Sequence, residues 1–309
     1  MSATMQQGTD IGASQPVFGR LLTAMVTPFD GLGAVNHGEV ARLASHLVDD
    51  LGHDALVING TTGESPTTSD AEKRALIESV VAAVGDRAQV VAGVGTFSTS
   101  HTIDLAQQAA DAGADGLLVV TPYYSRPPVD ALEAHFVDVA EATDLPCMLY
   151  DIPHRSGIPI PESTLISLGA HPRIVAVKDA KGDAVSSSAV IAATGLQYYA
   201  GDDGYLLPLL AVGGVGVVGT STHFTGLHAR AIIDAHLAGR PAEARAAHAN
   251  ALGVFRGVFA TQGCMMVKAA LDARGWAMGP CRPPMGVVPP AVLDGFLRTL
   301  DDLERGNIR

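Results

Sequence analysis

A lysine at the end of an apolar run is the residue in this sequence best suited to carbonyl chemistry. Lys178 directly follows the apolar residues 174–177, which predicts an amine at the end of a buried strand, above an apolar wall. Desolvation there favours the neutral amine, and a lysine with a lowered pKa is a nucleophile toward carbonyl groups at neutral pH. Position alone also allows a solvated loop lysine, or one paired with Asp179.

Hydroxyl groups follow two other apolar runs. Tyr150 ends one of them, and Thr61 and Thr62 stand in the turn after another, between Gly60 and Gly63. The hydroxyls of Tyr150 and Thr61 could relay protons, and the peptide N–H groups near Thr62 could bind a carboxylate if the glycines make the backbone permissive. A packed tyrosine and a tight turn are the simpler interpretations. The expected convergence of Tyr150, Thr61 and Thr62 with Lys178 on one face of the fold favours a functional site.

Arg155 is a candidate for binding a carboxylate. It lies in the loop after the run that contains Tyr150, and its guanidinium suits bidentate recognition, although a surface or subunit-interface ion pair is the alternative. We assign no catalytic role to the neighbouring His154. Gly201 follows the seventh apolar run, and we place it with the substrate-binding residues.

A metal site is not predicted. His223 and the pair at residues 202–203 stand near ends of apolar runs, but no His and carboxylate set has recognisable ligand spacing.

Eight short apolar runs must position these residues. They alternate with segments of helical period, as strands buried on both faces of a parallel sheet do. The predicted strands are residues 21–27, 54–59, 88–93, 116–121, 146–151, 173–178, 197–200 and 215–220. This pattern predicts a (β/α)8 TIM barrel, in which functional residues lie at the carboxyl ends of the strands. An open doubly wound sheet is the alternative, but residues 28–34 lack the GxGxxG turn.

Helix signals support the barrel. Ser69 and Glu72 have capping-box spacing ahead of a helix that ends near Gly85, with the apolar residues Leu76, Ile77, Val80, Val81 and Val84 on one face. A second helix is predicted from Val129, Leu132, Phe136, Val139 and Ala140. Residues 224–238 are the expected eighth helix. We therefore divide the chain into a flexible tail (1–17), a catalytic barrel (18–240) and a C-terminal helical region (241–309).

Composition narrows the classes of function. Apolar residues make up 47% of the 309 residues and the formal net charge is −12, which argues against nucleic acid or an anionic membrane as partner. A small anionic substrate would need a local positive site. Cys147, Cys264 and Cys281 are too few and too scattered for a disulfide framework, and we interpret them as reduced and structural. The absence of a signal pattern and of a long apolar stretch predicts a cytoplasmic protein.

Four motifs carry a resemblance to a known family. The sequence resembles the dihydrodipicolinate synthase branch of the dihydrodipicolinate synthase/N-acetylneuraminate lyase family from about Leu21 to Pro284. The motifs are Gly60-Thr61-Thr62-Gly63-Glu64-Ser65, Thr121-Pro122-Tyr123-Tyr124-Ser125-Arg126-Pro127, Tyr150-Asp151-Ile152-Pro153-His154-Arg155-Ser156-Gly157 and Val177-Lys178-Asp179-Ala180.

The resemblance implies a reaction without a metal or an organic cofactor. Lys178 would form a Schiff base with pyruvate, and the enamine would attack L-aspartate 4-semialdehyde to give 4-hydroxytetrahydrodipicolinate. Tyr150, Thr61 and Tyr124 match the proton relay of the family, with Tyr124 reaching the neighbouring subunit of a homodimer or homotetramer. Thr62 and the backbone near Val218 match the pyruvate pocket.

Two departures concern the substrate and its regulation. Arg155 favours the synthases, because sialic-acid lyases generally have an apolar residue there, but His154 replaces the usual Ser or Gly. The resemblance also places Asp70, Lys73, Phe97 and His101 where sensitive synthases bind feedback lysine, which predicts insensitivity to L-lysine. The alternatives are a sialic-acid or 2-keto-3-deoxy sugar acid aldolase and a non-catalytic ligand-binding barrel.

Overall fold

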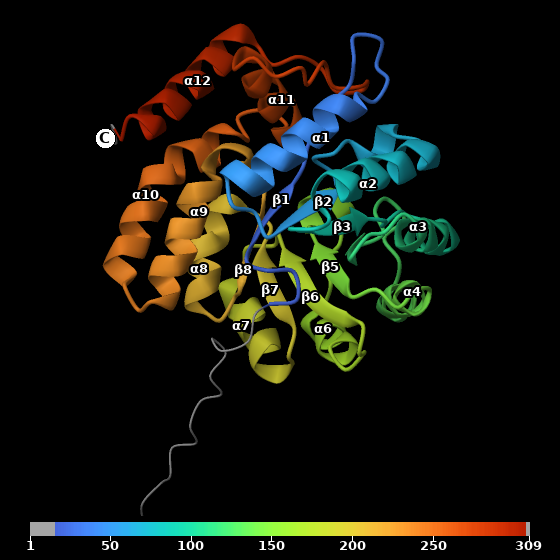
Figure 1. Ribbon diagram of the computed structural model, residues 1–309. Coiled ribbons are helices and arrows are strands. Elements are labelled where there is room, and N and C mark those ends of the chain that lie inside the picture. Colours follow the sequence, from blue (N-terminus) through green and yellow to red (C-terminus); the bar gives the residue numbers. More distant parts are fainter. Residues whose placement is uncertain (1–15, 307–309) are drawn as a thin grey trace, which may run out of the picture.

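The computed structural model describes residues 16–306 of the chain. The predicted tail, residues 1–17, lies outside the described residues except for its last two positions. The described chain forms a barrel of parallel strands surrounded by helices, with further helices at the C-terminal end (Figure 1).

Eight parallel strands close into a barrel in sequence order, because β1 pairs with both β2 and β8. The strands are β1 (Leu21–Ala24), β2 (Ala55–Ile58), β3 (Gln89–Gly93), β4 (Gly116–Val120), β5 (Cys147–Asp151), β6 (Ile174–Asp179), β7 (Gln197–Ala200) and β8 (Gly216–Gly219). Each coincides with a predicted apolar run, although β6 continues one residue further, to Asp179. The closed barrel is confirmed, and the open sheet is excluded.

Most helices cover the outside of the barrel. The helices are α1 (His37–Ser45, continued by a π-helical turn over His46–Asp50), α2 (Asp70–Val84), α3 (Thr99–Asp111), α4 (Val129–Glu141), α5 (Pro153–Ser156), α6 (Glu162–Leu168), α7 (Ala184–Ala193), α8 (Leu206–Ala211), α9 (Thr222–Leu237), α10 (Pro241–Gly257), α11 (Gly263–Ala273) and α12 (Pro290–Glu304). Helices α5, α10 and α11 contribute to the cavity at the mouth of the barrel. Short 3-10 turns span Ser65–Thr67 and Asp203–Tyr205.

Local sequence explains where α2 and α9 begin and end. The side chain of Ser69 accepts a hydrogen bond from the Glu72 backbone while Glu72 binds the Ser69 backbone, so the predicted capping box is present. The α2 face that packs on the barrel is built from Leu76, Ile77, Val80 and Val84. The eighth barrel helix, α9, begins at Thr222, two residues before the predicted start, and ends before Gly239.

The helix predicted after the fourth strand is confirmed as α4, which begins at Val129. Leu132, Phe136, Val139 and Ala140 are buried as expected, but Val129 is 50% exposed. Val129 is the first residue of the helix, where the chain has only just left the loop, so the apolar period does not bring its side chain onto the barrel.

The inside of the barrel has its own apolar cluster, separate from the layer between strands and helices. Leu22, Val57, Met148, Tyr199 and Val218 belong to it. The register pairs Lys178 of β6 with Tyr150 of β5 on one side and with Tyr199 of β7 on the other. This filled interior forms the floor beneath the carboxyl ends of the strands.

The C-terminal helices are part of the same packed body. Helix α10 packs along α9, and α12 contacts both α10 and α11; in Figure 1 they are coloured orange to red. A boundary at residue 240 stays a prediction.

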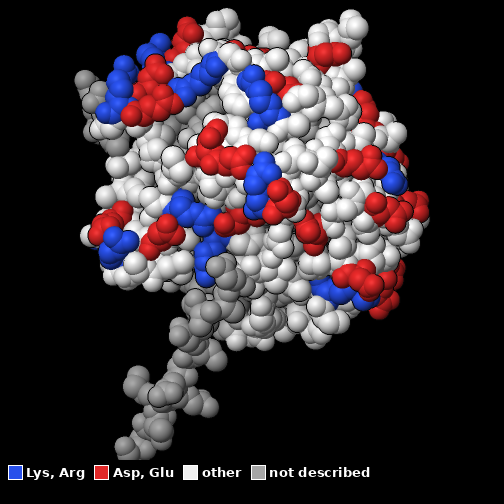
Figure 2. Space-filling view, in the orientation of Figure 1, with Lys and Arg blue, Asp and Glu red and all other residues white. Residues whose placement is uncertain are grey.

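The surface carries both signs of charge. Figure 2 shows acidic and basic side chains interspersed on one face. Arg87 contacts Asp49 and Arg274 contacts Asp301. In the part of the chain that the structure describes, no helix is both long and apolar enough to span a bilayer.

Candidate active site

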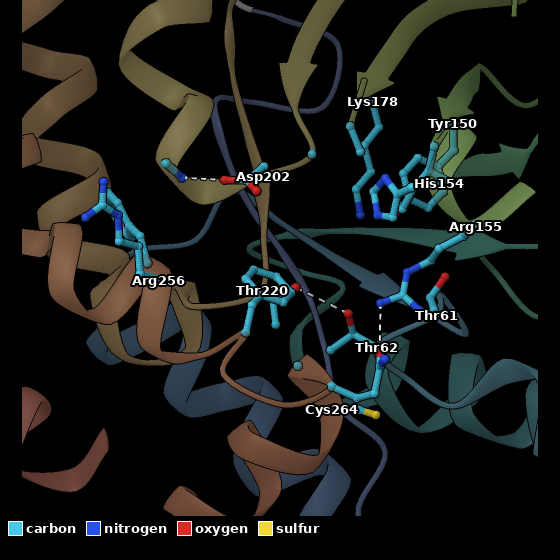
Figure 3. Close-up of a pocket in the computed structure, with 18 of the residues that line it drawn as sticks. Thr61, Thr62, Tyr150, His154, Arg155, Lys178, Asp202, Thr220, Arg256 and Cys264 are labelled. Carbon is cyan, nitrogen blue, oxygen red and sulfur yellow. Dashed lines mark hydrogen bonds between the residues drawn. The ribbon is translucent and has the colours of Figure 1, made fainter. Parts of the chain in front are cut away.

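A cavity of about 640 Å³ opens where the strands end (Figure 3). Seven residues highlighted by the sequence line it, namely Thr61, Thr62, Tyr150, His154, Arg155, Lys178 and Gly201. They come from loops after β2, β5 and β7 and from the strands β5 and β6, so the barrel brings together residues that lie up to 140 positions apart on the chain.

Lys178 lies at the base of this cavity and is 4% exposed. Its Nζ lies 4.3 Å from the centroid of the Tyr150 ring. The pKa of Lys178 is lowered to about 8, because burial lowers it strongly, the charge of Asp203 partly opposes this and the charge of Arg155 assists it. About one molecule in ten therefore carries the neutral, nucleophilic amine at pH 7.

Tyr150 presents a protonated hydroxyl beside this amine. Burial raises the pKa of its phenol well above the ordinary value, although the charge of Arg155 acts in the opposite direction. A phenol with a raised pKa holds its proton at neutral pH and can donate it to a developing alkoxide. Thr61 lines the same cavity, at its exposed rim, and no hydrogen bond joins the two hydroxyls among the interactions of the described residues.

Thr62 lies across the cavity from the strand that carries Lys178, where it contacts a residue that follows β8. The hydroxyl oxygens of Thr62 and Thr220 are 3.4 Å apart. Thr220 is fixed by the carboxylate of Asp203, which accepts hydrogen bonds from the Thr220 backbone at 3.1 Å and from the Ser221 hydroxyl at 2.7 Å. Asp203 thus both orients the wall of the cavity and raises the pKa of Lys178.

The turn that carries Thr61 and Thr62 does not use its glycines as expected. The left-handed residues are Asn59 (φ 60°) and Glu64 (φ 58°), whereas Gly60 and Gly63 do not have positive φ. Gly63 is instead required by close packing, since a Cβ there would lie 3.1 Å from the carbonyl oxygen of Met25. Gly63 is needed because the chain just after β1 passes directly behind the turn.

Arg155 projects toward the cavity from the short helix α5. Its Nη2 donates a hydrogen bond of 3.0 Å to Oε1 of Gln262. Arg155, Arg256 and Lys178 line the cavity with Asp202 as the single carboxylate among the described lining residues, so the local charge is positive in a chain of net charge −12. This is the local positive site that an anionic substrate needs.

His154 lies on the same side of the cavity as Lys178 and Tyr150 in Figure 3, opposite Arg256. His154 is exposed and lines the cavity, next to Arg155 in the sequence.

Two predicted residues lie outside the cavity lining. Tyr124 is 93% exposed, has a left-handed φ of 72° and lines a second cavity of about 370 Å³ that also touches Thr61 and Tyr150. Val218 is fully buried inside the barrel, and Thr220, two residues later, lines the cavity instead.

The sequence did not reveal the part of the wall that comes from the C-terminal helices. Helix α10 contributes Phe255 and Arg256, and the start of α11 contributes Gln262 and Cys264. No local pattern marks these residues. The side chain of His223, once considered for a metal site, is occupied by hydrogen bonds with Val26 N at 3.2 Å and Thr220 O at 2.8 Å.

Comparison with known proteins identifies the family of this chain. The model of the dihydrodipicolinate synthetase family matches residues 17–301. The 4-hydroxy-tetrahydrodipicolinate synthase of Cutibacterium acnes is 57% identical over 288 residues, which cover 93% of this chain and 98% of the relative. That of Acidothermus cellulolyticus is 59% identical over 268 residues and 87% of each chain.

Solved structures agree with this result. Dihydrodipicolinate synthase from Bacillus anthracis superimposes with a TM-score of 0.89 at 37% identity, covering 92% of this chain and 98% of its own. The enzyme from Cyanidioschyzon merolae, solved with lysine bound, gives a TM-score of 0.92 at 37% identity and covers 95% of this chain and 100% of its own. The chain therefore belongs to the dihydrodipicolinate synthetase family.

Proposed function

We propose that this chain is a 4-hydroxy-tetrahydrodipicolinate synthase, a lyase of the class I aldolase type that acts in lysine and diaminopimelate biosynthesis. It condenses pyruvate with L-aspartate 4-semialdehyde, and we place it in the cytoplasm. The observation that carries this proposal is Lys178, a buried amine with a pKa lowered to about 8 in a cavity with positive charge at its rim.

The reaction begins with a covalent bond between enzyme and pyruvate. The neutral amine of Lys178 attacks the keto carbon, the carbinolamine loses water, and a Schiff base results. Loss of a methyl proton gives an enamine whose carbon attacks the aldehyde of the semialdehyde, and Tyr150 donates a proton to the oxygen that becomes the hydroxyl. The amino group of the second substrate then displaces Lys178 and closes the ring, which regenerates the free amine.

Substrate carboxylates are assigned to two regions of the cavity. Thr62 and the adjoining peptide N–H groups bind the carboxylate of pyruvate, and Gly201 and the backbone near Val218 complete this part of the pocket. Arg155 binds the carboxylate of the semialdehyde, because a guanidinium forms two parallel hydrogen bonds with such a group. The proposed steps use neither a metal nor an organic cofactor.

Trapping with borohydride tests the nucleophile. Incubation with pyruvate and borohydride should place an N-carboxyethyl group on Lys178, which peptide mass spectrometry locates. Lys178→Ala should lose both the label and turnover while keeping the far-UV circular dichroism of the folded chain. Lys181→Ala is the matched control, because this lysine lies three residues away and should leave labelling intact. Absence of label on Lys178 would favour a non-catalytic barrel.

A substrate panel tests the second substrate. Rapid turnover is expected with aspartate 4-semialdehyde and pyruvate, and little or none with N-acetylmannosamine or glyceraldehyde as acceptor. The reverse preference would assign the chain to the sialic-acid or sugar-acid aldolases, with the same Schiff base on Lys178.

We also propose that Tyr124 completes the site of a neighbouring subunit in a homodimer or homotetramer. Its exposure and left-handed backbone, next to a cavity that reaches Thr61, support this placement. Tyr124→Phe and Lys178→Ala should each be nearly inactive alone. After unfolding and refolding together they should regain activity, because mixed assemblies contain sites with both side chains. If mixing restores no activity, Tyr124 is not shared.

A further inference from the structure

Two cysteines that lie 17 positions apart in the sequence are neighbours beside the candidate active site. Cys264, the second residue of α11, lines the cavity and is 6% exposed. Cys281 belongs to the segment between α11 and α12 and is half-buried. The two thiols are close enough for each to shift the pKa of the other, and both cysteines are free. All three cysteines are free, as expected, but these two lie close together although they are far apart in the sequence.

A buried ion pair holds the chain on both sides of Cys281. Lys268, one helical turn after Cys264, donates hydrogen bonds of 3.0 Å to Glu64 and to the carbonyl oxygen of Pro280. The backbone N–H of Arg282 donates to the other carboxylate oxygen of Glu64 at 2.8 Å. Because the residues before and after Cys281 are tied to this pair, the segment that carries Cys281 is held beside α11.

The two thiols are not equivalent. The hydrogen bond from Cys281 lowers the pKa of Cys264, and the charge of Lys268 acts in the same direction, while burial and Glu64 oppose it. The same hydrogen bond, together with burial, raises the pKa of Cys281. Cys264 also lies at the N-terminus of a helix of 11 residues, where a thiolate is stabilised. Cys264 is thus the attacking group, and Cys281 the resolving thiol.

We propose that Cys264 and Cys281 form an oxidation site in which a hydroperoxide converts the adjacent thiols into a disulfide at the wall of the cavity. The Cys264 thiolate attacks the terminal oxygen of hydrogen peroxide, the O–O bond breaks, and the hydroxide that leaves takes a proton to become water. Cys281 then attacks the sulfur of the resulting sulfenic acid, and a second water leaves as the S–S bond forms. The two thiols lose two electrons and two protons, and the peroxide is reduced to water.

The third cysteine provides an internal contrast. Cys147 lies in β5, is 1% exposed, and burial raises its pKa to about 12. Its thiol donates to the carbonyl oxygen of Leu145 at 3.6 Å. Such a thiol is protonated and inaccessible, so it should stay reduced under conditions that oxidise the pair.

The disulfide would fasten the segment between α11 and α12 to the helix that carries part of the cavity wall. Because the sulfurs are already neighbours in the folded chain, the bond restricts the unfolded chain more than it strains the folded one. The oxidised protein should therefore unfold at a higher temperature than the reduced protein.

The test is oxidation of the folded full-length chain with hydrogen peroxide, followed by alkylation of free thiols and mass spectrometry. The expected product has lost about two mass units, corresponding to two hydrogens, and yields one linked peptide pair containing Cys264 and Cys281 that dithiothreitol separates. Cys264→Ser and Cys281→Ser should each abolish this product, and Cys147→Ser should retain it.

Other results would overturn the proposal. These are a disulfide that persists in either Ser variant, one that forms only in denaturant or lowers the unfolding temperature, and oxidation of Cys264 to the sulfinic or sulfonic acid with Cys281 left free. If Cys264→Ser does not fold, Cys281→Ser carries the test, because its Cys264 should then stop at the sulfenic acid, which dimedone labels. None of these readouts depends on the catalytic activity proposed above.

Discussion

Arg155 and Gln262 are joined by a hydrogen bond of 3.0 Å although 107 positions separate them. Gln262 precedes α11, so the C-terminal helices hold the arginine that faces the cavity. An amide orients a guanidinium without neutralising it, whereas a carboxylate in the same place would cancel the positive charge that a substrate carboxylate needs. This pairing gives Gln262 a positioning role in our proposal.

We expect Arg155→Ala to raise the KM for the semialdehyde by about 10- to 100-fold, the value of a lost charged hydrogen bond. Gln262→Ala should raise it by only about 3- to 10-fold, because a neutral contact that orients the arginine is lost. Gln262→Glu should raise the KM for the semialdehyde more than Gln262→Ala does, since it places a negative charge beside Arg155. Steady-state kinetics with each substrate varied provide the measurement. Equal losses for pyruvate would contradict both assignments.

The rate of Schiff-base formation should follow the neutral fraction of Lys178. Its pKa of about 8 predicts a rate that rises about tenfold per pH unit below pH 8 and levels off above it. Arg155→Ala should move the rising part of this pH profile to higher pH, because Arg155 lowers the pKa of Lys178. Asp203→Asn should move it to lower pH, because Asp203 raises that pKa. Rapid-quench trapping with borohydride measures the rate of Schiff-base formation at each pH. Shifts in the same direction for both variants would be inconsistent with this account.

L-lysine in the sub-millimolar range should leave the steady-state rate unchanged. Lys73 places its own ammonium group at the expected effector positions, where it binds the Thr68 carbonyl oxygen and lies 3.8 Å from Asp70. The other oxygen of Asp70 is 2.9 Å from Nε2 of His101, and Phe97 adds an exposed apolar ring. A second cation would be repelled there. Inhibition by L-lysine that D-lysine at equal ionic strength does not reproduce would refute this expectation.

Removing one partner of the buried ion pair between Glu64 and Lys268 should destabilise the protein much more than replacing both. Both side chains are 2% exposed and 3.0 Å apart, so Lys268→Met leaves an unpaired buried carboxylate and should cost about 3–5 kcal/mol of unfolding free energy. Adding Glu64→Gln should recover most of that loss, because the neutral amide can still accept from Arg282. Urea unfolding measures both. Arg240→Ala, which removes an exposed ion pair, is the control and should cost less than about 1 kcal/mol.

Asp151 should make the protein less stable as the pH rises. Burial raises its pKa from 3.8 to about 6, against the opposing effect of Lys181 at 3.4 Å. Between these values the folded state binds more protons than the unfolded state, so the unfolding free energy falls by about 2.4 kcal/mol from pH 4 to pH 7. Asp151→Asn should remove this dependence, so its stability relative to the parent should increase toward pH 7. Urea unfolding at both pH values tests this, with the exposed Asp111→Asn as control; an unchanged pH profile in Asp151→Asn would contradict it.

Local sequence features were enough to predict the barrel and several residues that line its cavity. Strand runs buried on both faces, the capping box at Ser69 and the residues that close each strand are local features, and each acts over a few neighbouring positions. In a parallel barrel all strands end at the same face, so locating Lys178 and Tyr150 at strand ends was enough to predict that they meet. Residue propensity did not predict the backbone of the turn after β2. There Asn59 and Glu64 adopt positive φ, and the glycines do not.

Only the tertiary structure decided which distant residues complete the cavity. Three contacts have partners with no fixed spacing in the sequence and no shared local pattern. They join Gln262 to Arg155, Lys268 to Glu64 and Cys281 to Cys264. They exist because the C-terminal helices fold back over the barrel mouth, and burial there makes each polar partner necessary. Burial also sets the pKa of Lys178, a quantity that depends on the solvent excluded by the whole fold and not on the residues beside it in sequence.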